Sequence, residues 1–337
     1  MIGRTRRGRA ASVSAVIGSV LIGCAACATS PAASSNSAAG YPSHPVTIIV
    51  PYAAGGGVDL TARALAPVLQ KYLGKTVVVS DVSGAGGITG TSQAATSKPD
   101  GYTLFFDSPG IVDAPWTVKG VTFGPKSFEY IGQVTDIPDY LDVKASSQFK
   151  TLGQLVSYAK QHPGTLKAPM VSGWPSTAVE LVDFEHLAGV QFRTVTGYTG
   201  GPAELEAALA GQTDMSFNNT GEILADVKAG DVRILGVSSP TRSSFFPTAP
   251  TFKEQGYNVT EGVWQGLAAP AGTPKPIINK ISAALAKSVK DPSLASAFKK
   301  IGISVDYLDA ASTTKEINAQ YVSDGKLFQQ IGVAVKQ

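Results

Sequence analysis

The sequence predicts an α/β fold in two lobes, each a mostly parallel sheet flanked by helices. Two observations support this prediction. Apolar runs of strand length alternate with segments of helical periodicity in two separate stretches, and three further helical segments near the carboxyl end need a sheet to cover. The economical arrangement returns the chain to the first lobe after Val259, so that two crossing segments join the lobes.

The first alternation forms a βαβαβ unit. The apolar run 46–50 precedes a loop, and apolar residues then recur at helical spacing until Gly74 ends the pattern. A parallel sheet follows from two further strands connected by a short helix. The strands expected here are 46–50, 76–79, 102–106, 128–134 and 140–143, with helices at 58–73 and 88–97.

A second alternation occupies the middle of the chain, and helices dominate its end. His162-Pro-Gly164 closes the first helix of this part. The expected helices are 152–159, 176–189, 276–289, 292–300 and 312–331, and the expected strands are a run ending at 171, then 192–195, 214–217 and 233–237.

The first 40 residues have the composition of an export leader and a tether. Four arginines among the first nine residues precede the small, apolar stretch 10–22, which is typical of a signal peptide at 1–23. Leu21–Cys24 resembles a bacterial lipobox, so Cys24 is expected to carry a lipid, with an ordinary cleavage site as the alternative. Residues 24–40 predict a flexible tether. We expect an exported protein, anchored to the outer face of the cell membrane or located in the periplasm.

The folded part divides, on this pattern, into a first lobe of 41–143 and 263–337 and a second lobe of 144–262. A content of 43% hydrophobic and 16% charged residues is globular. The net charge of +3 includes the leader arginines, so nucleic acid is not expected as a partner. A monomer is expected.

The sequence offers little for catalysis or for a cofactor. The chain has three histidines, no Gly-x-Ser-x-Gly elbow and no cluster at metal-ligand spacing, so no catalytic residue and no metal are predicted. Gly84 and Gly86 lack the third glycine of a dinucleotide fingerprint, and Gly74-Lys-Thr76 lacks the first glycine of a P-loop. No cofactor is expected.

Two glycine-rich loops, 51–59 and 83–90, each lie between an expected strand and an expected helix. Glycines allow close backbone approach and helix starts have free N–H groups, so the pair predicts an anion site for phosphate or carboxylate. Each glycine could instead form only a tight turn, and Asp59 could simply cap its helix. The polar residues expected to line the cleft are Gly55, Gly56, Gly57, Asp59, Gly86, Gly87, Thr89, Ser108, Ser172, Ser176, Tyr198, Thr199, Asn218 and Asn219.

Together these segments resemble the tripartite tricarboxylate transporter receptors of the TctC/Bug type, and the resemblance covers 41–337. The matching segments, in the family's order, are 41–59, 84–87 (Gly-Ala-Gly-Gly), 99–104 (Pro-Asp-Gly-Tyr-Thr-Leu), 162–166 (His-Pro-Gly-Thr-Leu), 209–214 (Leu-Ala-Gly-Gln-Thr-Asp), 250–256 (Pro-Thr-Phe-Lys-Glu-Gln-Gly) and 264–274 (Trp-Gln-Gly-Leu-Ala-Ala-Pro-Ala-Gly-Thr-Pro).

The resemblance implies a flytrap-like, non-enzymatic binding protein. Such a protein captures a small carboxylate through loop amides, hydroxyls and water, and delivers it to a permease of one large and one small subunit. The residues carried over by motif position are Gly55, Gly56, Gly86, Gly87, Thr89, Ser172, Gly173, Ser176 and Asn218. An exported hydrolase using the same cleft, or a ligand sensor domain, is the alternative.

Three positions bear on the choice of ligand. Ala178 stands where the family often has histidine, and Thr199 where Tyr-Lys-Gly is usual, so a di- or tricarboxylate is less favoured. Trp174 could add a flat wall that suits an aromatic or aliphatic monocarboxylate, or it could be buried in the core.

Overall fold

The computed structural model describes residues 38–171, 176–198, 201–260, 262–330, 332 and 334–335. Residues 36–337 form one compact unit. The expected signal peptide, Cys24 and nearly all of the tether lie outside the described residues.

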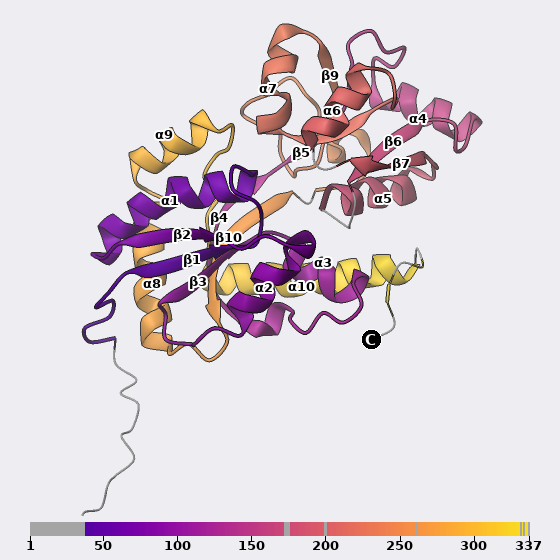
Figure 1. The fold of residues 1–337 in the computed structure, drawn as a ribbon. Coiled ribbons are helices and arrows are strands. Elements are labelled where there is room, and N and C mark those ends of the chain that lie inside the picture. Colours follow the sequence, from indigo (N-terminus) through magenta and orange to yellow (C-terminus); the bar gives the residue numbers. More distant parts are fainter. Residues whose placement is uncertain are drawn as a thin grey trace, which may run out of the picture. The chain divides into compact units, whose positions relative to one another are not determined.

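A six-stranded mixed sheet organises the first lobe (Figure 1). Its order is β11-β4-β10-β3-β1-β2. β1 pairs in parallel with β2 and β3, whereas β10 lies antiparallel between β3 and β4. The strands are β1 (Val46–Val50), β2 (Val77–Asp81), β3 (Thr103–Asp107), β4 (Phe128–Ile137), β10 (Val263–Pro270) and β11 (Leu308–Asp309).

Helices cover both faces of this sheet because its strands are apolar on both sides. Ile48 and Val50 pack with α1 (Gly57–Leu73), α8 (Lys275–Ser288) and α9 (Pro292–Lys300). Ile49 and Phe105 point to the other face. That face packs against α2 (Ile88–Ala95), α3 (Gly110–Thr117) and α10 (Ala310–Gln330).

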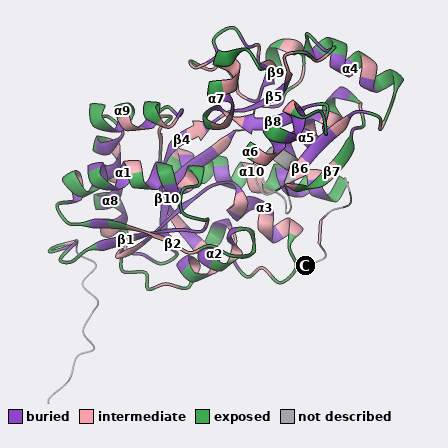
Figure 2. Cartoon of the chain, turned by 45° about the horizontal axis from the view of Figure 1, so that its top comes forward, coloured by how far each residue is buried: buried purple, intermediate pink, exposed green. Residues whose placement is uncertain are grey.

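The second lobe contains a three-stranded sheet, β8-β5-β9, and a separate parallel pair, β6 and β7. β5 runs antiparallel to both of its neighbours. The strands are β5 (Asp139–Lys144), β6 (Lys167–Val171), β7 (Arg193–Tyr198), β8 (Ser216–Asn219) and β9 (Val232–Val237), and the helices are α4 (Leu152–Gln161), α5 (Ser176–Ala188), α6 (Gly201–Leu209) and α7 (Thr220–Ala229). The buried residues of the central strands lie between exposed helix faces (Figure 2).

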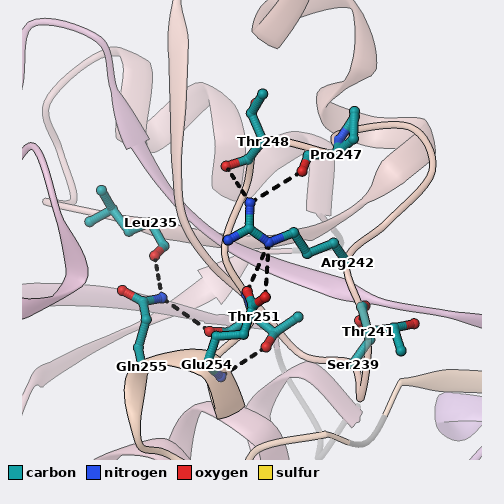
Figure 3. A network of polar contacts seen from close by, with 9 residues as sticks. All are labelled: Leu235, Ser239, Thr241, Arg242, Pro247, Thr248, Thr251, Glu254 and Gln255. Atoms are coloured by element: carbon teal, nitrogen blue, oxygen red, sulfur yellow. Dashed lines mark hydrogen bonds and ion pairs between the residues drawn. The ribbon is translucent and has the colours of Figure 1, made fainter.

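The long connection between β9 and β10 contains a polar network (Figure 3). Arg242 Nε binds both carboxylate oxygens of Glu254 at 3.0 and 2.9 Å, and its Nη1 donates to the carbonyls of Pro247 and Thr248. Gln255 Nε2 donates to the carbonyl of Leu235 at 3.0 Å, which attaches the same turn to β9. These side-chain bonds add to the backbone bridge between Val237 and Thr251, which joins the same segment to β9.

The two-lobed α/β class is confirmed, and most expected elements are present within a few residues. The sheets are more mixed than expected, because β10 enters the first sheet antiparallel and β5 is antiparallel to both neighbours. β5 pairs with β8 and β9, so the change of sheet falls between Ile137 and Asp139 and not after residue 143. Within the described part of the chain, no helix combines the length and apolar character needed to cross a bilayer.

Candidate ligand-binding site

The first glycine loop connects β1 to α1 and is stabilised by Asp59. Gly55 N–H donates to Asp59 Oδ2 at 2.7 Å, and Arg63 Nε lies 2.6 Å from Asp59 Oδ1. Arg63 also binds Asp81 on β2. Burial opposes ionisation of Asp59, yet the bond from Gly55 and the Arg63 guanidinium outweigh it and hold its pKa below the usual value. Asp59 is 1% exposed, so its carboxylate faces its own loop, whereas Gly55, Gly56 and Gly57 face solvent.

The second glycine loop depends on backbone conformations that favour glycine. Gly84, Gly86 and Gly87 have φ angles of 144°, 66° and 96°. A Cβ on Gly84 would lie 2.6 Å from Thr89 Oγ1, so the loop folds tightly onto the first turn of α2. Gly86 and Thr89 are exposed and Gly87 is buried. The second glycine loop is therefore a tight turn, as one of the two interpretations expected. Its exposed residues still offer backbone N–H groups.

A third loop, after β3, joins the first two through Tyr52. Tyr52 Oη lies 3.0 Å from Ser108 Oγ, and a Cβ built on Gly87 would lie 3.0 Å from the ring of Tyr52. Burial raises the pKa of Asp107, which precedes Ser108. Ser108 was expected in the site from the sequence, but Tyr52 was not, because an aromatic residue after a strand carries no signal of its long-range partner.

Two of the expected second-lobe residues, Asn218 and Asn219, lie at the end of β8. Asn218 is fully buried and its Nδ2 donates to Asp142 Oδ2 at 3.0 Å. Asn219 caps α7: its Oδ1 accepts from Gly221 N–H at 3.0 Å, and Glu222 accepts from Asn219 N–H at 2.9 Å. Tyr198 is half-buried at the end of β7.

Some of the expected second-lobe residues cannot be placed. Ser172, Gly173, Trp174 and Thr199 lie outside the described residues, and of Ser176 only its place at the start of α5 is described.

Buried carboxyl groups accompany the second-lobe loops, which the sequence did not indicate. Asp139 and Asp142 are fully buried, and Glu180 and Glu204 are 4% and 2% exposed. Burial, followed by the charge of Glu222, raises the pKa of Asp139, and burial raises that of Asp142 to about 6. No lysine or arginine is buried in the described part of the chain. Asp139 and Asp142 lie on β5, whereas Glu180 and Glu204 lie on helices. Charged residues usually face solvent in either element, so the sequence alone gives no sign of this burial.

Three cavities lie away from the glycine loops. One of about 120 Å³ lies between α5 and α10, lined by Glu180, Asp183 and Asp324 among others. Two larger ones, of about 300 and 510 Å³, share Asp136 and Asp306 near the segments that connect the lobes. Among the described residues, none of those expected to bind a ligand lines these three cavities.

The model of the tripartite tricarboxylate transporter family receptor, TctC, matches residues 61–333. The chain belongs to this family.

Relatives of this TctC receptor cover almost all of its folded part. Protein BugT of Bordetella pertussis is 32% identical over 285 residues, 82% of this chain and 85% of BugT. The structure of the periplasmic binding protein BugD matches with a TM-score of 0.74 and 30% identity, covering 88% of this chain and 100% of BugD. A TctC solute-binding protein from Polaromonas matches with a TM-score of 0.76 and 27% identity, covering 86% of this chain and 99% of the other.

Membership of the TctC family decides the functional class. The chain is a solute-binding receptor and not an enzyme, so the hydrolase alternative is excluded. The first-lobe loops are then suited to binding, because their backbone N–H groups and a serine hydroxyl can bind a solute without reacting with it.

Proposed function

We propose that this receptor captures a small carboxylate and delivers it to the membrane subunits of a tripartite tricarboxylate-type transporter. The observation that carries the proposal is the exposed glycine loop before α1. Gly56, the N-cap residue of α1, has no side-chain cap among the described contacts, and Asp59 already has Arg63 as its partner. The loop therefore offers N–H groups at a helix start without a free carboxylate to repel an anion.

Two structures of the same fold support the choice of ligand class. Rhodopseudomonas palustris Rpa4515 was solved with adipate, at a TM-score of 0.76 and 24% identity. MatC of the same organism was solved with bound malate, at a TM-score of 0.72 and 24% identity. At this identity the likeness concerns the fold, so adipate and malate are starting probes for this protein.

The ligand would lie between the lobes, which would close on it by bending at the crossing segments. We keep the whole set of residues expected from the sequence, from Gly55 to Asn219, as the proposed contact set, with Asp59 acting through the loop that it stabilises by accepting from Gly55 N–H. The proposed lobes are 41–143 with 263–337, and 144–262. The pairing of β5 with β8 and β9 favours moving the first boundary to just before Asp139.

The leader completes the proposal. Residues 1–23 would direct export, and Cys24 would carry a lipid that holds a monomeric receptor at the outer face of the membrane. Replacing Cys24 by alanine should release the protein from the membrane fraction without changing its affinity for ligand. Unchanged membrane association of this variant would remove the anchor from the proposal.

A thermal-shift screen of mono-, di- and tricarboxylates, including adipate and malate, tests the central proposal. A carboxylate at 100 times its Kd should stabilise the protein by about 2.7 kcal/mol, whereas its amide analogue should not. Uptake of the same compound in cells with and without the receptor then tests delivery and separates a receptor from a sensor domain. A complete lack of stabilisation by carboxylates would contradict the proposed ligand class.

A further inference from the structure

Tyr52 lies where three loops of the first lobe meet. It directly follows β1 and Pro51, and its hydroxyl is 3.0 Å from Ser108 Oγ at the end of β3. Its ring lies against Gly87 of the second glycine loop, where an added Cβ would be 3.0 Å from Cε1. One half-buried side chain therefore contacts every first-lobe loop of the proposed site.

Two glycines make room for this side chain. Gly87 also needs its positive φ of 96°. Gly110, the first residue of α3, shows no such need: an added Cβ would meet only the Tyr52 hydroxyl, at 2.8 Å. Alanine is a better helix former than glycine. The Tyr52 hydroxyl therefore explains why position 110 is glycine, since a larger residue would clash with its oxygen.

We propose that Tyr52 is a positioning residue of the ligand site, which joins the three loops and orients the Ser108 hydroxyl toward the ligand. The inference rests on the proposed function. Either hydroxyl can donate across the 3.0 Å between Tyr52 Oη and Ser108 Oγ; when Tyr52 donates, the hydrogen of Ser108 is free to donate to a carboxylate oxygen. Such chains of hydrogen bonds strengthen one another.

The surroundings of Tyr52 keep its hydroxyl protonated. Burial, followed by the nearby charges of Asp107 and Asp113, raises the pKa of Tyr52, so its hydrogen is present across the physiological range. Asp107 is 4% exposed and its own pKa is raised by burial. The hydrogen of the Tyr52 hydroxyl is therefore present at neutral pH.

The first test removes only the hydroxyl. Tyr52→Phe should weaken binding of adipate or malate, measured by calorimetry, about 3- to 10-fold. Tyr102→Phe is the matched control, because the hydroxyl of Tyr102 accepts from Ser43 N–H, at 2.9 Å, at the surface of the same lobe. Equal affinities of wild type and Tyr52→Phe would overturn the proposal.

Hydrogen exchange of the ligand-free protein tests the joining of the loops. Amides of 84–89 and 108–112 should exchange about threefold faster in Tyr52→Phe and not in Tyr102→Phe. Unchanged exchange would refute the role of Tyr52. Because this measurement needs no ligand, it decides that role even if neither acid binds, an outcome that would count only against the proposed function.

A double variant tests the geometry itself. Gly110→Ala places a methyl group against the Tyr52 oxygen, so alone it should lower Tm by about 2–4 °C. Tyr52→Phe removes that oxygen, so Gly110→Ala should cost less than about 1 °C in that background. If Gly110→Ala costs the same in both backgrounds, Tyr52 is not what position 110 accommodates.

Discussion

The two halves of the proposed site differ in where their negative charges lie. In the first lobe, Asp59 beside the glycine loop is paired with Arg63, and Arg63 is half exposed. In the second lobe, Asp139 and Asp142 are fully buried, and the described buried residues include no cation to balance them. Asp107, in the first lobe, is also buried, and burial raises its pKa above the usual value.

This difference indicates how a carboxylate would be oriented. The first half offers exposed N–H groups beside a neutralised carboxylate, whereas the start of α7 is already occupied by Asn219 and Glu222. We therefore expect the ligand carboxylate at the glycine loops and its remaining polar groups near Asn218. The predictions below test whether the halves differ in rigidity and in charge as the structure indicates.

The largest effect is expected at Gly90, in the first half. An added Cβ would lie 2.4 Å from the carbonyl oxygen of Val82 and 2.7 Å from Pro51 Cα, both backbone atoms. Because backbone cannot rotate away, Gly90→Ala should reduce the free energy of unfolding in urea by about 3 kcal/mol. Gly153→Ala in α4, whose nearest neighbour would be Thr151 Oγ1 at 4.0 Å, is the control and should cost nothing. Equal costs would contradict the rigid packing of the loop.

The second prediction concerns pH and Asp142. Its pKa is raised from 3.8 to about 6, so the folded state binds more protons than the unfolded state between these values. The stability contributed by this proton is therefore lost as pH rises from about 4 to 7, by about 2–3 kcal/mol. Asp142→Asn should flatten that part of the dependence of unfolding free energy on pH. A variant that follows the wild-type curve would show that Asp142 is ionised in both states.

A third prediction tests a contact in the second lobe whose partner is a side chain and can move. A Cβ on Gly201 would lie 2.2 Å from Glu222 Oε2, a side-chain atom. Gly201→Ala should cost about 2 kcal/mol in the wild type and at least about 1 kcal/mol less in a Glu222→Ala background. Thermal or urea unfolding of the four proteins of this cycle provides the measurement. Strict additivity would mean that Glu222 does not occupy the space above Gly201.

The smallest effect is expected from the polar network of Arg242. Arg242 and Glu254 are both about half exposed, so their ion pair should contribute little despite its good geometry. Arg242→Ala should reduce the unfolding free energy by about 0.5–1 kcal/mol, mainly through the bonds to the Pro247 and Thr248 carbonyls. Unfolding in high salt separates the two contributions, since only the ion pair is screened.

Local sequence patterns predicted most helices and strands, but they did not predict which strands pair with each other. The helix from Val58 to Gly74 and the strand at 46–50 follow from periodicity and a glycine stop, and both are present. α3 was not predicted, because Gly110 and Pro115 break a short helical pattern. The antiparallel entry of β10 between β3 and β4 depends on pairing across more than 120 residues, which no local pattern encodes.

The site shows the same division. Glycine spacing and a family resemblance indicated the first-lobe loops. Asp59, which was expected either to cap α1 or to bind the ligand, instead accepts from Gly55 N–H in the preceding loop and pairs with Arg63. Tyr52 and the buried Asp142 could not be inferred, because the first depends on empty space at Gly87 and Gly110 and the second on burial of a polar residue. Both depend on tertiary packing, which determines what a residue type does.

The position of β10 also has a consequence for how the chain folds. β10 is the shared neighbour of β3 and β4, yet it comes after the entire second lobe in the sequence. The first sheet therefore cannot close until residue 270 is available, whereas β5 to β9 are complete by residue 237. As the chain becomes available from its amino end, β5 to β9 can therefore pair before the first sheet is complete.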